Sequence, residues 1–165
     1  MSVAQSLKIK RLREDVPAPD FAHPGDAGLD LRAADGCTIA PFERILIPTG
    51  ISLAIPEGHA GLILPRSGNA LKQGLSLANT PGLIDSGYRG EIKVLAINLD
   101  PRIPITIEPG DRIAQLVIIA TAQLALIEAD ELDTTIRGAG GFGSTGTGSQ
   151  IDQKGRAEGQ VLQDQ

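Results

Sequence analysis

The sequence predicts an all-β protein made mainly of short strands. Segments of strand length either alternate apolar and polar residues or form short apolar runs, and Gly and Pro residues separate these segments at close intervals. The chain of 165 residues contains 20 glycines and 11 prolines, so it turns often. Only one stretch has the start and stop residues of a helix. This pattern is typical of a sandwich, a barrel or a jelly roll.

In chain order, Leu7–Arg13 alternates with period two and predicts the first strand. Residues Cys37–Gly58 predict two strands, with Pro48-Thr49-Gly50 near the turn between them. Residues His59–Pro65 predict another strand, because the run is apolar and ends at a proline that cannot donate to a sheet.

Ser67–Gly74 predicts one short helix, which Ser67 can cap and Gly74 can end. Residues Glu91–Asp100 and Ile103–Leu124 predict three more strands, with a tight turn at Glu108–Asp111 between the last two.

The length fits one domain with a core of Ile, Leu, Val and Ala, because aromatic residues make up only 2% of the chain. We expect residues 1–133 to form the β core. We expect residues 134–165 to form a flexible C-terminal arm, since from about Ile136 the residues are mostly small or polar.

The charge and the cysteine content limit the classes of ligand and the cellular compartment that we expect for this protein. A net charge of −5 argues against general affinity for nucleic acid or for an anionic membrane surface, although locally gathered cations could still bind a small polyanion. Cys37 is the only cysteine, so an intrachain disulfide is excluded and a reducing compartment is favoured. The sequence shows no signal peptide and no membrane-spanning run. We therefore expect a cytoplasmic protein.

Three arginines, Arg66, Arg112 and Arg137, occur in unusual settings. Arg66 stands between a strand end and the predicted helix, where Ser67, Gly68 and the first backbone N–H groups could cradle an anion. The alternative is that all three are surface arginines in weak ion pairs.

The glycine-rich stretch Arg137–Gly146 invites a phosphate-binding interpretation. It is neither a Walker A loop nor a dinucleotide fingerprint, because the Lys-Ser/Thr pair and the βαβ context are missing. A flexible linker is the alternative. Phe142 argues against a linker, since a lone ring among glycines has nothing to pack on, whereas aromatic rings stack on bases.

Asp85 lies three residues before Tyr88, the only tyrosine of the chain. A carboxylate near phosphates can deprotonate a water that attacks phosphorus. It can also simply satisfy backbone groups of a turn, which is the commoner case. Asp26 and Asp30 carry the same ambiguity. Asp30 alternates with apolar neighbours, so its side chain could face the core or a partner chain.

Together these stretches resemble the trimeric deoxyuridine triphosphatases (dUTPases). The resemblance implies a distorted jelly-roll β-barrel that assembles as a homotrimer with active sites at subunit boundaries. It also implies hydrolysis of dUTP to dUMP and diphosphate, with Mg²⁺ held on the triphosphate. Five segments match the family's motifs in the family's order: Asp26–Ala33, Pro65–Lys72, Asn79–Ile92, Gly110–Val117 and Arg137–Gly146.

The resemblance assigns roles to individual residues. Asp85 would be the general base, holding the water that attacks the α-phosphorus. Tyr88 would lie against the deoxyribose and exclude a 2′-hydroxyl, and Lys93 would contact substrate. Asp30 would be an outer-shell carboxylate that reaches magnesium through water. Asn79 and the backbone of the Leu83–Asp85 hairpin, which includes Ile84, would read the uracil edge, and the hairpin would exclude a thymine methyl. Gly82 would also bind substrate.

The remaining roles concern the phosphates and the arm. Gln115 would contact the α-phosphate region, and Phe142 would stack on uracil from a third subunit. Arg66, Ser67 and Gly68 would bind phosphates from a second subunit. The residues that would close over the γ-phosphate are Arg137, Gly143, Ser144 and Thr145.

The sequence thus predicts a dUTP diphosphatase that keeps uracil out of DNA and supplies dUMP for thymidylate synthesis. One alternative is deoxycytidine triphosphate deaminase, which shares the fold; the intact segment Gly82–Glu91 favours the hydrolase. The other is a non-catalytic nucleotide-binding or regulatory β-sandwich. Retention of Asp85 and of the arm argues against it.

Overall fold

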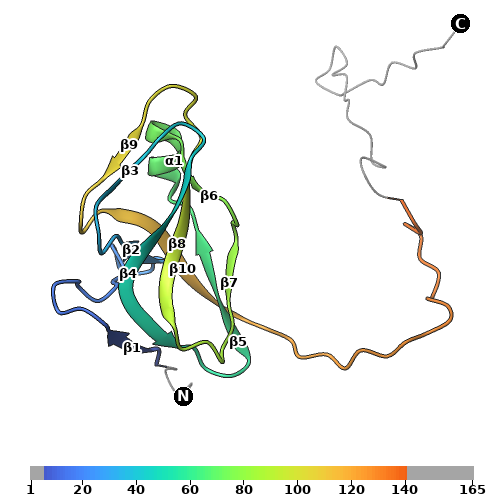
Figure 1. The fold of residues 1–165 in the computed structure, drawn as a ribbon. Coiled ribbons are helices and arrows are strands. Elements are labelled where there is room, and N and C mark those ends of the chain that lie inside the picture. The colour runs from blue at the N-terminus through green and yellow to red at the C-terminus, as the bar shows by residue number, and fades with distance from the viewer. Residues whose placement is uncertain (1–5, 141–165) are drawn as a thin grey trace, which may run out of the picture. The chain divides into compact units, whose positions relative to one another are not determined.

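The computed structural model describes residues 6–140 (Figure 1). The chain divides after Leu124 into two units, Met1–Leu124 and Ala125–Gln165, and each is described by itself. The described residues contain ten strands and one short helix, which confirms the all-β class.

The first unit consists of two four-stranded sheets and a two-stranded ribbon, and every strand pairing among them is antiparallel. The first sheet has the order β1-β4-β8-β6, the second has the order β2-β10-β5-β7, and the ribbon pairs β3 with β9. The elements are β1 (Lys8–Arg11), β2 (Leu29–Arg32), β3 (Cys37–Ile39), β4 (Arg44–Ala54), β5 (His59–Leu64), α1 (Ser67–Gln73), β6 (Leu75–Leu77), β7 (Gly82–Ile84), β8 (Glu91–Asn98), β9 (Ile105–Ile107) and β10 (Arg112–Ala120).

One aliphatic core joins the two sheets. Strand β8 shows the pattern that builds it: Ile92, Val94 and Ala96 are buried, whereas Lys93 between them is exposed. Successive residues of a strand point to opposite faces, so alternation places every second side chain in the core. The second sheet contributes equally buried side chains such as Leu116 of β10.

The predicted turn at Pro48-Thr49-Gly50 is wrong, because β4 runs through it as one strand of 11 residues. The register between β4 and β8 shifts between Pro48 and Ser52, as expected for a β-bulge. Gly50 has φ +65°, and a Cβ there would lie 2.9 Å from Val16 Cγ2. A bulge needs the same residues as a tight turn, and burial against Val16 keeps the strand continuous.

The helix ends as predicted and begins differently. Gly74 takes the left-handed conformation (φ +71°), and its N–H donates to the carbonyl of Ala70. Ser67 is already the first helical residue, Arg66 holds the N-cap position, and no side chain caps the helix. The prediction that Ser67 caps α1 is therefore wrong.

Three short strands, β2, β6 and β7, are absent from the sequence-based prediction. Each has only three or four residues, which is too short for a periodic pattern to register. Each pairs with a longer strand, β2 with β10, β6 with β8 and β7 with β5, and β2 and β7 position residues of the candidate site.

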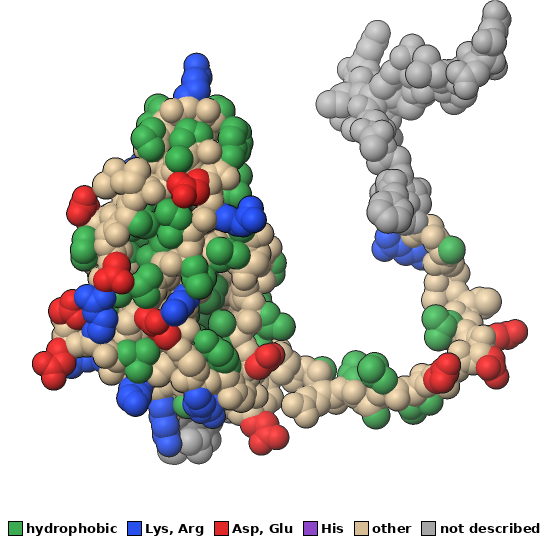
Figure 2. Space-filling view, viewed as in Figure 1, with side chains coloured by type: hydrophobic (Ala, Val, Ile, Leu, Met, Phe, Trp, Pro, Cys, Tyr) green, Lys and Arg blue, Asp and Glu red, His purple; other side chains and the backbone are tan. Residues whose placement is uncertain are grey.

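The second unit is described over residues 125–140, which contain no helix or strand. Its large apolar side chains, among them Leu126, Ile127 and Ile136, are exposed, and Figure 2 shows a group of acidic side chains between apolar ones along this segment. Arg137 makes a local turn, in which its Nε donates to the carbonyl of Gly140 at 3.0 Å. The predicted residues Phe142, Gly143, Ser144 and Thr145 lie outside the described residues. No helix in the described part combines the length and apolarity needed to cross a bilayer.

Candidate functional site

The central strand of the second sheet, β10, brings three distant segments together. Gln115 of β10 is paired with Asp30 of β2 on one side and with Leu64 of β5 on the other. The Gln115 amide donates from Nε2 to the carbonyl of Pro65 at 3.1 Å. A Cβ on Gly28 would lie 3.0 Å from Gln115 Oε1, so glycine at this position permits the close approach.

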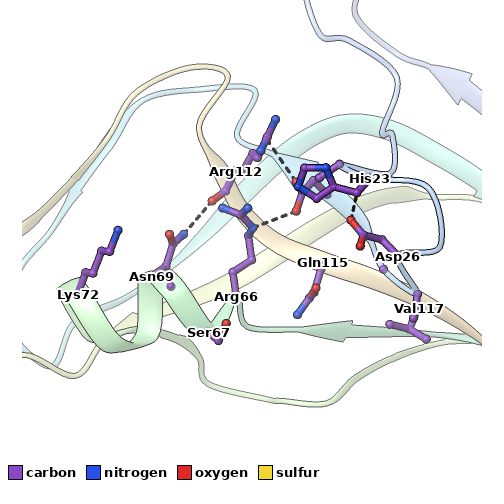
Figure 3. A pocket seen from close by; sticks show the side chains of 14 residues that line it. His23, Asp26, Arg66, Ser67, Asn69, Lys72, Arg112, Gln115 and Val117 are labelled. Carbon is purple, nitrogen blue, oxygen red and sulfur yellow. Dashed lines mark hydrogen bonds and ion pairs between the residues drawn. The ribbon is translucent and has the colours of Figure 1, made fainter.

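A cavity of about 670 Å³ opens beside Gln115 (Figure 3). We call it the arginine cavity. Five residues predicted from the sequence line it, namely Asp30, Arg66, Ser67, Gly68 and Gln115. The structure also places Asp26 and Arg112 here, which the sequence singled out without a settled role, and adds His23, Asn69, Lys72 and Val117.

Asp30 is the electrostatic centre of the arginine cavity. Its side chain is only 7% exposed, and its Oδ1 lies 2.9 Å from Arg66 Nε. Its Oδ2 lies 3.3 Å from Arg112 Nε, and the dashed lines from Arg66 and Arg112 in Figure 3 mark both ion pairs. A buried carboxylate is tolerated only when it is paired, so Asp30 and the two guanidinium groups hold one another in place.

The same geometry tests the predicted metal role of Asp30. Guanidinium groups occupy the approaches to both carboxylate oxygens, and the described residues contain no group of three or more His, Cys, Asp or Glu side chains able to hold an ion. Asp30 Oδ2 is buried and accepts no hydrogen bond from the described residues. The outer-shell role of Asp30 toward magnesium stays a prediction.

Helix α1 is tied to β10 at the edge of the cavity. Asn69 Nδ2 donates to the carbonyl of Arg112 at 2.8 Å, which fixes the helix against the strand. Lys72 in the last turn also lines the cavity. Arg66, Lys72 and Arg112 outnumber the two carboxylates on its wall, so a chain of net charge −5 gathers positive charge here.

His23 reaches the cavity from a short turn before β2 (Figure 3). Asp26 closes this turn, because its Oδ2 accepts the backbone N–H of His23 at 2.9 Å. The backbone N–H of Asp26 donates to the carbonyl of His23 at 3.2 Å. Nothing in the sequence indicated this placement, since it depends on how the turn folds over the sheet.

Asp85 lies in a second hollow, of about 290 Å³, which we call the aspartate hollow. Within the described residues the Asp85 carboxylate makes no hydrogen bond or ion pair, and the residue is exposed. Its oxygens are therefore open to a ligand or a water. The hollow brings together five predicted residues, Leu83, Ile84, Asp85, Tyr88 and Lys93, and adds Leu46 and Glu91.

Tyr88 is held in place beside Asp85. Its hydroxyl donates to the carbonyl of Glu91 at 3.0 Å. A Cβ on Gly90 would collide with the Tyr88 ring, so only glycine lets the ring lie there. Arg89 closes the turn by donating to the carbonyls of Ser86 and Tyr88. The ring stays 45% exposed, so it can still contact a ligand.

Asn79 and Gly82 line a small cleft of about 50 Å³ next to the aspartate hollow. A Cβ on Gly82 would lie 3.3 Å from Asn79 Nδ2, so the amide packs directly over the glycine. Lys93 borders both spaces, and its Nζ lies 3.5 Å from Glu91 Oε2. The predicted residues on β7 and β8 thus share one region of the surface.

The arginine cavity and the aspartate hollow share no lining residue. Within one chain, therefore, Arg66 and Gln115 do not line the same space as Asp85 and Tyr88. Arg137 belongs to the second unit. The predicted site residues form two groups, plus the arm, and not one pocket.

Known proteins with similar sequences indicate the family of this chain. A family model described as dUTPase matches residues 14–146. A deoxyuridine 5′-triphosphate nucleotidohydrolase of Nocardia farcinica is 49% identical over 164 residues, which cover 99% of each chain. The protein of the same name from Thermobifida fusca is 54% identical over 140 residues, 85% of this chain and 78% of the relative.

Solved structures of dUTPases have a similar fold. A Staphylococcus bacteriophage 80alpha dUTPase mutant with dUpNHpp has a TM-score of 0.79 at 30% identity, covering 86% of this chain and 99% of the other. A mutant dUTPase from phage phi11 of S. aureus, described for its coordination of a structural Mg(II) ion, has a TM-score of 0.72 at 28% identity. It covers 77% of this chain and 98% of its own.

Proposed function

Because the chain belongs to the dUTPase family, we propose that it hydrolyses dUTP to dUMP and diphosphate in the cytoplasm. The activity would keep uracil out of DNA and supply dUMP for thymidylate synthesis. The observation that carries this proposal is the match of residues 14–146 to the family model, which includes every segment that lines the arginine cavity and the aspartate hollow. The free thiol of Cys37 fits a reducing compartment.

Asp85 would act as the general base in this reaction. Its exposed carboxylate has no partner among the described residues, so it can take a proton from the water that attacks the α-phosphorus. Tyr88, held by its hydroxyl bond to the carbonyl of Glu91, would rest against the deoxyribose. Asn79 and the β7 backbone would read the uracil edge from the adjoining cleft.

The arginine cavity would bind the phosphates. Arg66, Ser67, Gly68 and Gln115 line it, and the ion pair with Asp30 holds the Arg66 guanidinium in position before a ligand arrives. Such preorganised positive groups stabilise charge that develops on transferring phosphoryl groups. Mg²⁺ bound through the triphosphate would supply further neutralisation of the phosphate oxygens.

A homotrimer with shared active sites would unite the two groups of residues. One chain presents the arginine cavity and the aspartate hollow as separate spaces, as expected where one substrate bridges two chains. Arg137 and the predicted arm residues Phe142, Gly143, Ser144 and Thr145 would then close over the substrate from a third chain.

The assay that tests this function measures three products in parallel with Mg²⁺ present: diphosphate from dUTP, diphosphate from UTP, and ammonia from dCTP. We expect rapid diphosphate release from dUTP alone. The uracil-reading groups would be left unpaired by cytosine, a mismatch that sites of this kind reject strongly. Ammonia from dCTP would establish the deaminase instead, and binding of dUTP without turnover would establish a regulatory protein.

A further inference from the structure

Another hollow, of about 320 Å³ and separate from the aspartate hollow, lies against the arginines of the arginine cavity. We call it the outer hollow. Arg66, Asn69 and Arg112 line both spaces, whereas Arg32, Gln73 and Thr106 line only the outer hollow. We propose that the outer hollow is a binding site for a small inorganic oxyanion of the phosphate class, distinct from the site proposed for the substrate phosphates.

The charge of the outer hollow favours an anion. Three arginines, Arg32, Arg66 and Arg112, contribute to its wall. The one carboxylate on the wall is Asp111, and its Oδ2 accepts the backbone N–H of Glu108 at 2.9 Å. Asp30 does not line the outer hollow, but it pairs with Arg66 and Arg112. Three arginines beside these two carboxylates leave one positive charge in excess, in an acidic protein.

The arginines keep donors available for a ligand. Arg66 and Arg112 contact Asp30 through Nε, and Figure 3 shows the outer end of Arg112 directed away from Gln115. Arg32 donates from Nη1 to the carbonyl of Gly110 at 2.9 Å, which anchors its position. A guanidinium has five N–H donors in a fixed fork, so each arginine can still donate to an oxyanion.

Neutral donors and space complete the site. Gln73 ends α1 and Thr106 lies on β9, so side-chain amide and hydroxyl groups come from two further elements. A water molecule takes up about 30 Å³ in the liquid. The outer hollow is thus large enough for a phosphate together with several waters.

The shared arginines couple the two spaces. An oxyanion in the outer hollow would compete for the free nitrogens of Arg66 and Arg112 with phosphates in the arginine cavity. Inorganic phosphate should therefore raise the apparent KM for dUTP. This consequence rests on the proposed role of Arg66 in substrate binding, whereas the binding of phosphate itself does not.

Calorimetric titration of the full-length protein with inorganic phosphate, at constant ionic strength and without nucleotide, tests the site directly. Arg32→Gln removes one charge and keeps an amide that can donate to the carbonyl of Gly110. We expect it to weaken phosphate binding about tenfold or more, the effect of losing a hydrogen bond to a charged group. Arg44→Gln is the matched control, because Arg44 is exposed on β4 and lines neither space; its phosphate affinity should be unchanged.

A pair of substitutions at Gln73 tests whether positive charge in the outer hollow favours phosphate binding. Gln73→Glu should weaken phosphate binding and Gln73→Lys should strengthen it, each by several-fold. Both variants and Arg32→Gln should keep the kcat and KM for dUTP measured without phosphate within about twofold of wild type, since neither Gln73 nor Arg32 lines the arginine cavity or the aspartate hollow. Retained turnover also shows that the variants fold.

Two further measurements complete the test. A parallel titration with diphosphate separates the sources: equal weakening by Arg32→Gln assigns the site to a single phosphoryl group, and weakening for diphosphate alone assigns it to the reaction product. Phosphate inhibition of dUTP hydrolysis should need about tenfold more phosphate in Arg32→Gln, in line with the weaker binding. The proposal is overturned if wild type binds neither anion, or if Arg32→Gln and Arg44→Gln bind phosphate equally well.

Discussion

Asp30 and Asp85 show how the surroundings of a carboxylate decide its use. The Asp30 side chain is 7% exposed and lies between two arginines. Asp85 is exposed and has no side-chain partner among the described residues. Asp30 therefore serves to hold Arg66 and Arg112 in place, whereas Asp85 leaves both carboxylate oxygens open to a ligand or a water.

This contrast leads to a prediction for Asp85→Asn. The variant should lose at least about a hundredfold in turnover, the lower end of what a general base contributes. It should still bind a non-hydrolysable dUTP analogue, because the phosphate and uracil contacts remain. Diphosphate release and calorimetric titration measure the two quantities, with exposed Asp130→Asn as control. Turnover near the wild-type rate would remove Asp85 from the proposed role.

Some site residues can be predicted from the sequence and others cannot. Asp85 and Tyr88 stand out in one continuous segment with an unusual composition, so a local reading finds them. His23 reaches the arginine cavity only through the way the turn before β2 folds, which no local pattern encodes. Asn69 and Lys72 follow Arg66 at intervals of three residues in the predicted helical segment, so helical spacing could have indicated them.

At the level of elements, Gly74 links α1 to the loop after β8. Its φ is +71°, and an added Cβ would lie 2.8 Å from the backbone nitrogen of Asp100. Two effects therefore disfavour any residue other than glycine at position 74. The left-handed conformation is strained for residues with a Cβ, and the Cβ would collide with backbone atoms that cannot easily move.

Gly74→Ala should destabilise the protein by about 1–3 kcal/mol, the range for an incompatible backbone together with a steric clash. Gly68→Ala is a matched control in the same helix, because nothing lies within 4 Å of its added Cβ. We expect that change to stabilise by up to about 1 kcal/mol, as alanine is the better helix former. Urea unfolding at fixed chain concentration measures both; equal stability of the two variants would contradict the assignment.

The loop after β8 depends on an aspartate. Asp100 Oδ1 accepts the backbone N–H groups of Arg102 and Ile103, each at 2.8 Å. These two bonds lower the pKa of Asp100 below its ordinary value of 3.8. A lowered pKa in the folded state means that the charged form stabilises the fold above the ordinary value.

The pH dependence of Asp100→Asn follows from this shift. Wild type should be more stable than the variant at neutral pH. The difference should shrink as the pH falls below about 3.8 and disappear below the folded pKa, because protonation removes the charge that the loop binds. Urea midpoints between pH 7 and pH 3 provide the measurement. A difference that does not change with pH would show that the charge of Asp100 contributes nothing.

Prediction of elements succeeded where strands are long and failed where tertiary contacts decide. Strands β8 and β10 were predicted, because eight or nine residues establish a pattern. The bulge in β4 was mistaken for a turn, since Pro48 and Gly50 suit both, and only burial against Val16 separates them. Ser67 lies one residue too late to cap α1, within the usual uncertainty of helix boundaries.

For the whole molecule, the separation of the arginine cavity from the aspartate hollow is the central observation. Their lining residues do not overlap, although the proposed reaction needs cations and a base around one triphosphate. A symmetric assembly that places the arginine cavity of one chain near the aspartate hollow of the next would satisfy this need.

Mixing two inactive variants tests the shared site. Arg66→Ala and Asp85→Asn should each be nearly inactive alone. Co-assembled in equal amounts, they should regain about a quarter of wild-type activity, because random assortment around a symmetric interface gives some sites an intact residue from each chain. Diphosphate release from co-purified, differently tagged chains measures the effect, and each variant re-assembled with itself is the control. If the mixture stays inactive, Arg66 and Asp85 act within one chain.

The central position of β10 also has a consequence for motion. Its residues Gln115 and Leu116 are flanked by β2 on one side and by β5 on the other, so their amides can exchange with deuterium only when a large part of the second sheet opens. Asp85 follows β7, an edge strand of three residues, where small openings suffice. In the proposed site, therefore, the phosphates would bind beside the slowly exchanging backbone of β10. Asp85 would approach them from an edge strand whose amides exchange faster.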